Sequence, residues 1–330
     1  MLIEENKDLS PLSAIGIGGN ALYYSEIENT EDIVEIVNFS KEKNLPLTIV
    51  GGGTNTIFNE GTLNRVIGLM RIEGIELISE DTIKVGAGED WDKVVAWTVD
   101  NNLSGIEALS AIPGTMGAGP VQNIGAYGAE ISDTFVSAEV YDLDKNELIT
   151  LDKNQCGFSY RDSIFKQNPG RYIIATVTLQ LSKEKPTVPE YKDVQKYFED
   201  NDSPTLGEIR DAIISIRSNK LPDPKIVPNL GSYFKNPIVS KEEFERLQDP
   251  NIPNFEVPNG IKLFAGWLIE QCGFKGQTID GIKVYEKNAL VLTNPEKVKF
   301  ENLQRAESEI IEKVQEKFGI TLEREPNIIE

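Results

Sequence analysis

The sequence predicts an α+β fold, with a larger mixed α/β domain followed by a smaller one. Strands, glycine turns and helices alternate through residue 99, a pattern typical of a mixed α/β domain. Residues 172–181 alternate in a period of two, which predicts a long strand further along. Pro222 and Pro224 then interrupt the chain after a helical segment, so we expect a second domain to begin there. The chain has 330 residues, enough for about two domains.

The first elements of the larger domain follow from charge and spacing. Residues 30–44 are predicted to be a helix, because Glu31 and Asp32 place negative charge in its first turn. Residues 47–50 predict a strand that runs into a glycine run, and residues 82–85 predict a second strand. The side chains that recur at helical spacing after it are Trp91, Val94, Val95, Thr98 and Val99.

Two short strands and a capped helix complete this domain. Residues 136–151 predict two strands around a turn at residues 144–146. Thr205 and Glu208 form a capping-box pair, which is typical of a helix start. The apolar stripe of that helix comprises Ile209, Ala212, Ile213 and Ile216.

The smaller domain is predicted to contain helices over residues 263–271 and 295–318. We expect Asn294 to cap the second helix, Pro295 to stand in its first turn and Gly319 to end it. The side chains predicted to face its core are Phe300, Leu303, Ile310 and Val314.

The composition excludes several classes of function. There are 33 Lys and Arg residues against 53 Asp and Glu residues, and the net charge of −20 repels nucleic acid and anionic membrane surfaces. The chain has no histidine, which removes histidine triads, histidine metal ligands and histidine bases. Cys156 and Cys272 form no CxxC pair and are expected to be ordinary thiols. Without a leader-like or membrane-spanning stretch, we expect a cytoplasmic protein, with no metal site.

Two glycine-rich segments are the strongest motifs. Residues 51–55 follow a predicted strand, where backbone N–H groups can approach a phosphate closely, although a simple tight turn is an equal alternative. Residues 112–128 are too rich in glycine and proline for a regular helix. Gln122 occupies the third glycine position of a dinucleotide fingerprint, so a conventional dinucleotide-binding fold is disfavoured. This segment is predicted either to line a flat cofactor or to be a long structural loop.

Three polar side chains are candidates for chemistry. The planar guanidinium of Arg161 suits a carboxylate or an enolate, although alone it would be a solvated charge. Ser232 has no histidine to activate it, so it is better suited to donate a proton or a hydrogen bond, with a turn serine as the alternative. Glu325 would orient Arg161 or share its proton chemistry, unless it belongs to an exposed acidic tail. Positive charge that favours an anionic ligand gathers at Arg217, Lys220, Lys225 and Lys235, with scattered solubilising lysines as the alternative.

Together these segments resemble the UDP-N-acetylenolpyruvoylglucosamine reductase (MurB) family over nearly the whole chain. The matching segments, in order, are residues 51–55, 85–89, 112–128, 160–166, 220–224, 231–237, 265–269, 289–292 and 322–325. The resemblance implies a PCMH-type FAD-binding domain over residues 1–215, in two lobes at about 1–68 and 69–215, joined by the tail at residues 318–330. Residues 216–317 would form the smaller substrate-binding domain. The Tyr160 loop and Tyr191 resemble the longer family type, in which a tyrosine-bearing loop covers the substrate.

The resemblance also implies a set of site residues. Non-covalent FAD would lie against Gly51, Gly52, Gly53, Thr54, Asn55, Ile112, Pro113, Gly117, Ala118, Gly119, Ile124, Gly125 and Ile174. Arg161, Ser232 and Glu325 match the family's catalytic trio. Tyr160, Tyr191, Lys220 and Asn236 match substrate-binding positions, of which the last three would hold the UDP portion.

The reaction that the resemblance implies has two halves. NADPH reduces the flavin and leaves before UDP-N-acetylglucosamine enolpyruvate enters. Hydride passes from N5 of FAD to C3 of the enolpyruvyl group, Ser232 gives C2 its proton, and UDP-N-acetylmuramate results for peptidoglycan synthesis. Arg161 would stabilise the developing negative charge, and Glu325 would position Arg161 or polarise the substrate. We expect a monomer. A related FAD-dependent alcohol oxidase and a non-catalytic flavin- or UDP-sugar-binding protein remain as alternatives.

Overall fold

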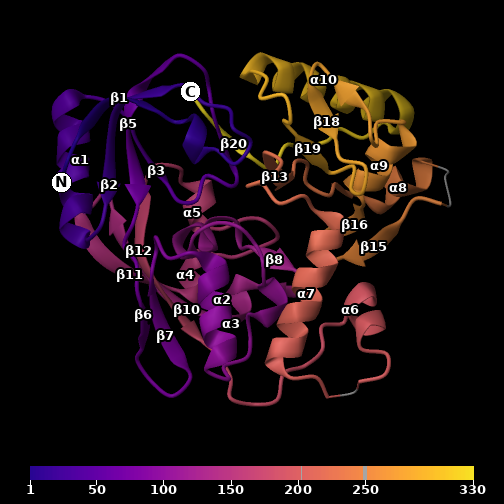
Figure 1. Cartoon of the computed structure of the whole chain (residues 1–330), viewed down its shortest axis with the longest axis horizontal. Helices are drawn as coiled ribbons and strands as arrows, with labels where there is room; N and C mark the ends of the chain where they lie inside the picture. The colour runs from indigo at the N-terminus through magenta and orange to yellow at the C-terminus, as the bar shows by residue number, and fades with distance from the viewer. Residues whose placement is uncertain (202, 248–250) are drawn as a thin grey trace. The chain divides into compact units, whose positions relative to one another are not determined.

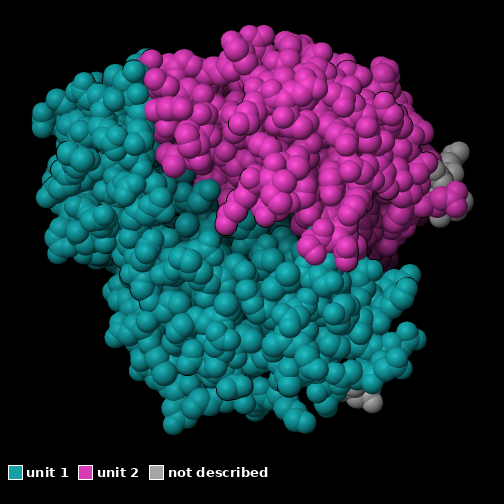
Figure 2. Space-filling model, in the orientation of Figure 1, with its two compact units in different colours: residues 1–7, 21–52, 64–217 teal, residues 8–20, 53–63, 218–330 magenta. Residues whose placement is uncertain are grey.

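The protein is described by a computed structural model that covers residues 1–201, 203–247 and 251–330. The chain folds into two compact units, which Figure 2 colours separately. Unit 1 comprises residues 1–7, 21–52 and 64–217, and unit 2 comprises residues 8–20, 53–63 and 218–330. Two early segments of the chain therefore belong with its last third. The functional domains predicted from the sequence stay a prediction.

The larger sheet of unit 1 has five antiparallel strands in the order β11-β10-β12-β7-β6. Its strands are β6 (Ile75–Leu77), β7 (Thr82–Gly86), β10 (Phe135–Asp142), β11 (Glu147–Asp152) and β12 (Tyr172–Gln180). The strands predicted at residues 82–85, 136–151 and 172–181 are thus confirmed, and β12 lies between β10 and β7 (Figure 1). Because β12 is central, its apolar side chains are covered, and Ala175, Val177 and Leu179 are fully buried.

A second sheet of unit 1 has the order β1-β2-β5-β3, with a few end residues assigned to unit 2. Its strands are β1 (Glu4–Asp8), β2 (Asn20–Ile27), β3 (Leu47–Val50) and β5 (Thr62–Met70). Helix α1 (Thr30–Lys43) precedes β3, as predicted, and the Asn29 side chain caps it by accepting a 2.9 Å bond from the Asp32 N–H. Ile33 and Ile36 of this helix are buried in the unit 1 core.

Three further helices lie in unit 1, except for the last three residues of the third helix, which belong to unit 2. They are α2 (Trp91–Asp100), α6 (Lys192–Tyr197) and α7 (Leu206–Lys220). The predicted capping box of α7 is confirmed, because the Thr205 N–H donates to Glu208 at 2.7 Å and the Glu208 N–H donates to Thr205 Oγ1 at 3.2 Å. Its predicted apolar stripe packs with Val194 and Phe198 in a small separate core. The shorter helices are α3 (Ile131–Thr134), α4 (Lys153–Cys156) and α5 (Ile164–Gln167).

Unit 2 is built from small sheets and one long helix. One sheet has the order β13-β19-β18-β17 and another the order β14-β16-β15, while β4 pairs in parallel with β20. The strands are β4 (Thr56–Phe58), β13 (Asn229–Ser232), β14 (Ile238–Val239), β15 (Asn254–Val257), β16 (Gly260–Leu263), β17 (Thr278–Ile279), β18 (Ile282–Val284), β19 (Val291–Thr293) and β20 (Asn327–Ile329). The helices are α8 (Lys241–Arg246), α9 (Ala265–Gln271) and α10 (Phe300–Phe318).

The predicted start of the last helix is wrong. Helix α10 begins at Phe300, because Lys297 has a left-handed φ of 52° that no α-helix accommodates. Asn294 is not its cap: its Oδ1 accepts the Val298 N–H at 2.8 Å within a turn, and its Nδ2 donates to the Ile15 carbonyl at 3.2 Å. The predicted end at Gly319 is confirmed, as is the burial of the four predicted core residues.

The helix predicted from residue 263 also begins later, at Ala265. Leu263 is still the last residue of β16, paired with Asn254 of β15. The Ala265 N–H at the start of α9 donates to Asn236 Oδ1 at 3.0 Å, so a side chain distant in sequence caps the helix. Within the described ranges, no helix combines the length and the apolar character needed to cross a membrane.

One paired charge joins α2 to α7 in unit 1. Arg210 donates to both carboxylate oxygens of Asp92, at 2.7 and 2.8 Å, and the Ala111 N–H donates to Asp92 at 2.6 Å. Burial alone would raise the pKa of Asp92, but these hydrogen bonds outweigh it and hold the pKa below its ordinary value. The stabilising effect is therefore present above the ordinary pKa and is lost as the pH falls through the depressed one.

We expect Asp92→Asn to lower the free energy of unfolding at pH 7 by about 1–3 kcal/mol, because a charged hydrogen-bond partner of Arg210 is lost. The difference from the parent protein should shrink below about pH 4, because the Asp92 carboxyl of the unfolded parent takes up a proton there before that of the folded parent does. Urea unfolding at a series of pH values measures both effects. Asp211→Asn, at an exposed position of α7, is the matched control. An undiminished difference at pH 3 would contradict this account.

Candidate active site

The first glycine segment lies at the end of β3 and crosses from unit 1 to unit 2 after Gly52. Gly53 has a left-handed φ of +62°, and a Cβ at this position would lie 1.5 Å from the Leu12 carbonyl oxygen. Only glycine satisfies both conditions, so the segment is more constrained than an ordinary turn. Asn55 continues into β4, and its carbonyl accepts the Asn327 N–H at 3.0 Å.

The second glycine segment forms an irregular wall in unit 1. It contains 3-10 turns at Met116–Ala118 and Pro120–Gln122 and then a hairpin of β8 (Gly125–Ala126) and β9 (Ala129–Glu130). Backbone bonds fix it: the Met116 N–H donates to Glu89 at 2.8 Å and the Gly117 N–H to Ala87 at 2.8 Å. The segment is therefore held in one course although it contains no long helix or strand.

A buried hydroxyl in this wall has no partner. Thr115 Oγ1 is buried and makes no hydrogen bond among the described residues. A Cβ on Gly51 would lie 2.3 Å from this oxygen, so only glycine leaves the approach open. A buried polar atom without a partner is costly and suggests a ligand that supplies one. The orphaned hydroxyl beside a glycine backbone fits a cofactor that is held mainly by polar atoms.

The predicted cofactor residues Ile124 and Ile174 lie on the apolar side of this wall. Ile174 belongs to β12 and is 7% exposed, opposite Val140 of β10. Ile124 packs against the same core and is partly exposed. The other residues of this segment predicted to contact FAD differ in exposure: Pro113 and Ala118 are exposed, Ile112 and Gly117 are half-buried, and Gly119 is buried.

Arg161 lies in the loop between α4 and α5 and is brought to the hairpin of the wall. Its Nη2 donates to the Gly125 carbonyl at 2.8 Å, and its guanidinium lies 5.1 Å from the Tyr160 ring centre. Its own carbonyl accepts a 2.9 Å bond from Lys166 Nζ, and its φ of 55° is left-handed. This unusual backbone conformation is stabilised by the surrounding bonds and directs a fixed cation beside Gly125. From the sequence, Gly125 is predicted to contact FAD and Arg161 to be catalytic.

Tyr191, predicted to contact substrate, stands just before α6 and is 41% exposed. Its ring meets the ring of Tyr127 edge to face, with centroids 5.1 Å apart. Tyr127 is hydrogen-bonded to Arg217 of α7, whose pKa is lowered by burial. Sequence reasoning missed Tyr127, which has a left-handed φ of 52° in the glycine-rich segment. The available signal was a large aromatic residue between the glycines of a turn, where glycine itself is common.

The segments that carry Ser232 and Glu325 pair with each other in unit 2. Ser232 ends β13, opposite Val291 of β19, and is half-buried. The Glu325 N–H donates to the Tyr233 carbonyl at 2.9 Å, next to Ser232 in the chain. The pairing continues through the bridge of Phe234 with Arg324 and the bond of the Lys235 N–H to the Glu323 carbonyl, also 2.9 Å. Pro326 is compatible with this course, because it favours an extended conformation for Glu325.

The residues of the predicted basic cluster are divided between the two units, and one of them forms an ion pair. Lys235 pairs with Glu323 at 2.9 Å. Arg217 belongs to unit 1, whereas Lys220 and Lys225 are exposed residues of unit 2. Asn236 uses its Oδ1 to accept the Ala265 N–H. Its side-chain orientation is therefore set by α9.

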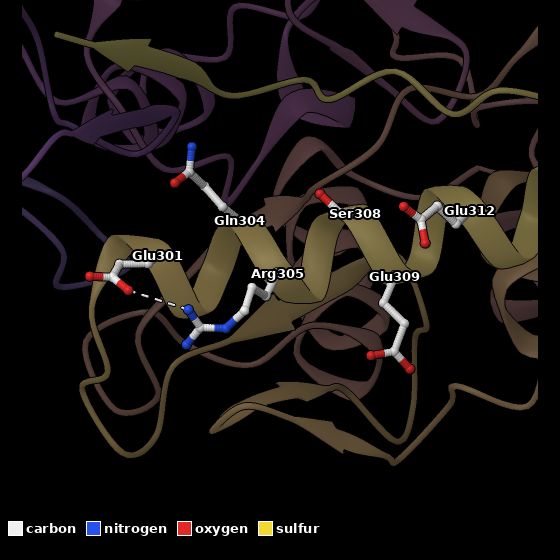
Figure 3. Close-up of a pocket in the computed structure, with 6 residues that line it drawn as sticks. All are labelled: Glu301, Gln304, Arg305, Ser308, Glu309 and Glu312. Carbon is white, nitrogen blue, oxygen red and sulfur yellow. Dashed lines mark hydrogen bonds and ion pairs between the residues drawn. The ribbon is translucent and has the colours of Figure 1, made fainter.

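A surface hollow on α10 contains none of the predicted site residues. Figure 3 shows its lining along the helix, with the ion pair of Glu301 and Arg305 at 3.3 Å. The other lining residues are Gln304, Ser308, Glu309 and Glu312, and all six are exposed. We therefore assign no part of the site to this hollow.

Comparison with known proteins identifies the family. A family model described as "FAD binding domain" matches residues 21–152, and one described as "UDP-N-acetylenolpyruvoylglucosamine reductase, C-terminal domain" matches residues 223–329. A UDP-N-acetylenolpyruvoylglucosamine reductase of Polynucleobacter asymbioticus is 40% identical over 99% of this chain and 96% of its own length. The chain belongs to the UDP-N-acetylenolpyruvoylglucosamine reductase family. A member from Cupriavidus pinatubonensis is 41% identical, over 96% of each chain.

The fold agrees with a solved member of this reductase family. The crystal structure of UDP-N-acetylenolpyruvylglucosamine reductase (MurB) from Thermus caldophilus has a TM-score of 0.70, at 21% identity, over 100% of this chain and 98% of that one. The predicted family, the predicted fold class, the assignment as an oxidoreductase and FAD as its cofactor are thus confirmed. The roles of the individual residues stay predictions.

We expect Thr115→Val to separate stability from cofactor affinity. Removing an unpaired buried hydroxyl should raise the free energy of unfolding of the apoprotein by up to about 1 kcal/mol. Loss of one hydrogen bond to FAD should weaken its binding about 5- to 10-fold. Urea unfolding and titration of flavin fluorescence measure the two effects. Thr115→Ser keeps the hydroxyl and is the control, so equal FAD affinity of the two variants would show that the hydroxyl does not contact the cofactor.

Proposed function

We propose that this member of the family reduces the enolpyruvyl group of UDP-N-acetylglucosamine enolpyruvate to UDP-N-acetylmuramate, with NADPH as the electron source, in peptidoglycan synthesis. The relatives that cover the full length carry the name of this reductase. The observation that supports the chemistry is the pairing of the Ser232 strand with the Glu325 tail in unit 2. It brings together two backbone segments, distant in the sequence, that carry Ser232 and Glu325.

Each proposed catalytic residue has a role that follows from its chemistry. FAD, when bound, supplies the hydride that adds to C3 of the enolpyruvyl group. Ser232 then donates its hydroxyl proton to C2, which a weak acid does only because the developing carbanion is strongly basic. Arg161 stabilises the negative charge on C2 and the carboxylate, since a fixed cation in a dry site is worth several kcal/mol. Glu325 positions Arg161 or polarises the substrate.

The UDP portion is assigned to residues that present polar groups from three segments. Lys220 ends α7 and is exposed, and an ammonium group is suited to a diphosphate. The exposed ring of Tyr191 is the part of the predicted loop that would cover the substrate, and Tyr160 lies beside Arg161. Asn236, oriented by α9, offers its amide N–H groups.

Three further features complete the proposal. NADPH and the sugar nucleotide use one site in turn, so the reaction is of the ping-pong type. The protein acts as a monomer in the cytoplasm, where both soluble substrates are expected. The FAD-binding domain comprises residues 1–215 with the tail at 318–330, and residues 216–317 form the substrate-binding domain.

An anaerobic titration tests the proposed function directly. Purified protein with FAD is first reduced by NADPH, and UDP-N-acetylglucosamine enolpyruvate is then added while the flavin absorbance is followed. Return of the oxidised spectrum on adding the substrate supports the reductase. Bleaching that the substrate does not reverse, but oxygen does, would replace this proposal with an oxidase. A flavin that NADPH leaves oxidised would indicate a binding protein.

We expect Ser232→Ala to slow flavin reoxidation by the substrate about 10²- to 10⁴-fold, because the proton donor is lost. Flavin reduction by NADPH should change little, since it needs no proton from this side chain. Stopped-flow absorbance measures the two steps separately. Ser308→Ala, at an exposed position of α10, is the control. Normal reoxidation in Ser232→Ala would assign the proton transfer to another group.

A further inference from the structure

A glutamate occupies the buried face of α10 in unit 2. The helix buries Phe300, Leu303, Ala306, Ile310 and Val314, and Glu307 lies among them with 9% of its surface exposed. Its neighbours Glu301 and Glu309 lie on the outer surface of the same helix (Figure 3). A carboxylate in such surroundings is costly unless charged and polar partners satisfy it.

Two side chains satisfy Glu307. The Tyr233 hydroxyl donates to its Oε2 at 2.8 Å, and Arg324 Nη1 lies 2.9 Å from Oε2 and 3.0 Å from Oε1. Arg324 Nε additionally donates to the Pro326 carbonyl at 3.2 Å. Burial, and then the nearby Glu307 carboxylate, raise the pKa of Tyr233, so its hydroxyl stays a donor at neutral pH.

Both partners are direct chain neighbours of the residues to which we assign chemistry. Tyr233 follows Ser232, and Arg324 precedes Glu325. The Tyr233 N–H donates to the Leu290 carbonyl at 2.7 Å and its carbonyl accepts the Glu325 N–H at 2.9 Å, so its backbone joins the residue before β19 to the tail. One carboxylate thus binds a side chain from each of the two segments that pair with each other.

We propose that Glu307, acting through Tyr233 and Arg324, is a positioning residue that fixes the placement of Ser232 relative to Glu325. This inference rests on the proposed function, which assigns the proton donor to Ser232. Backbone pairing sets the register of the two segments, and the Ser232 and Glu325 side chains are half-buried. The side chains of their chain neighbours are anchored on Glu307, and a buried ionic hydrogen bond resists displacement more than an exposed one. A displacement of about 1 Å at reacting groups can cost about 10²-fold in rate.

The test compares the two half-reactions in Glu307→Gln holoenzyme. The amide keeps the size of the side chain but removes the charge and turns an acceptor oxygen into a donor that faces Arg324. We expect reoxidation by UDP-N-acetylglucosamine enolpyruvate to slow about 10- to 100-fold, while flavin reduction by NADPH changes less than about 2-fold. Glu309→Gln, which makes the same change on the exposed face of α10, should leave both steps unchanged. Equal losses in both half-reactions, or none in either, would overturn the inference.

A second variant covers the case in which Glu307→Gln does not fold. Tyr233→Phe removes only the hydroxyl from the network, and we expect it to slow reoxidation about 3- to 10-fold without changing flavin reduction. Where both single variants fold, the double variant should be no slower than Glu307→Gln alone, because the two residues act through one hydrogen bond. Unchanged reoxidation in Tyr233→Phe would overturn the inference for the Tyr233 branch.

The same assay separates this inference from the proposed function. Normal reoxidation in Ser232→Ala would contradict the proposed proton donor. Slow reoxidation in Ser232→Ala together with normal reoxidation in Glu307→Gln would contradict the positioning role alone.

Discussion

A carboxylate taken out of water has to be paired, and in unit 2 this requirement determines the course of the last segment of the chain. Glu307 is covered by the apolar side chains of α10, and Arg324 is the cation that reaches it. With Arg324 held there, residues 323–325 pair with residues 233–235, which follow Ser232, and β20 then pairs with β4. The placement of Glu325 thus depends on the pairing of its chain neighbour Arg324 with Glu307, in addition to the bond of its own N–H to the Tyr233 carbonyl.

Much of the fold could be predicted because its elements depend on local patterns. The acidic first turn of α1, the capping box of α7 and the alternation in β12 are complete within the elements themselves. The start of α10 could not be predicted in this way. Asn294 and Pro295 resemble a helix start, but Asn294 is bound to Ile15 from the other end of the sequence, and Lys297 takes a conformation that ends any helix. Long-range hydrogen bonds override a local signal here.

In the candidate site, too, local features could be predicted from the sequence and long-range contacts could not. Glycine runs and the neighbourhoods of Arg161, Ser232 and Glu325 are visible as motifs, since each is contiguous in the sequence. The edge-to-face contact of Tyr127 with Tyr191 is not, because it depends on how two loops fold back on one another. The sequence contains a signal for Glu307, because this residue stands four positions after Leu303 and three before Ile310, where an apolar residue is expected on the helix face. A charge at such a position needs a partner, but the sequence alone does not show that this partner is Arg324.

The parallel pairing of β4 with β20 also bears on how the molecule is made. Residues 56–58 leave the ribosome early and pair with residues 327–329, so unit 2 cannot close until nearly all of the intervening chain has been synthesised. Most of unit 1 lies between these strands and contains its own large core, which allows it to fold in the meantime. Such distant pairing slows folding, because the loop that must close is long. During synthesis, β4 therefore lacks its β20 partner until the last residues of the pair have emerged.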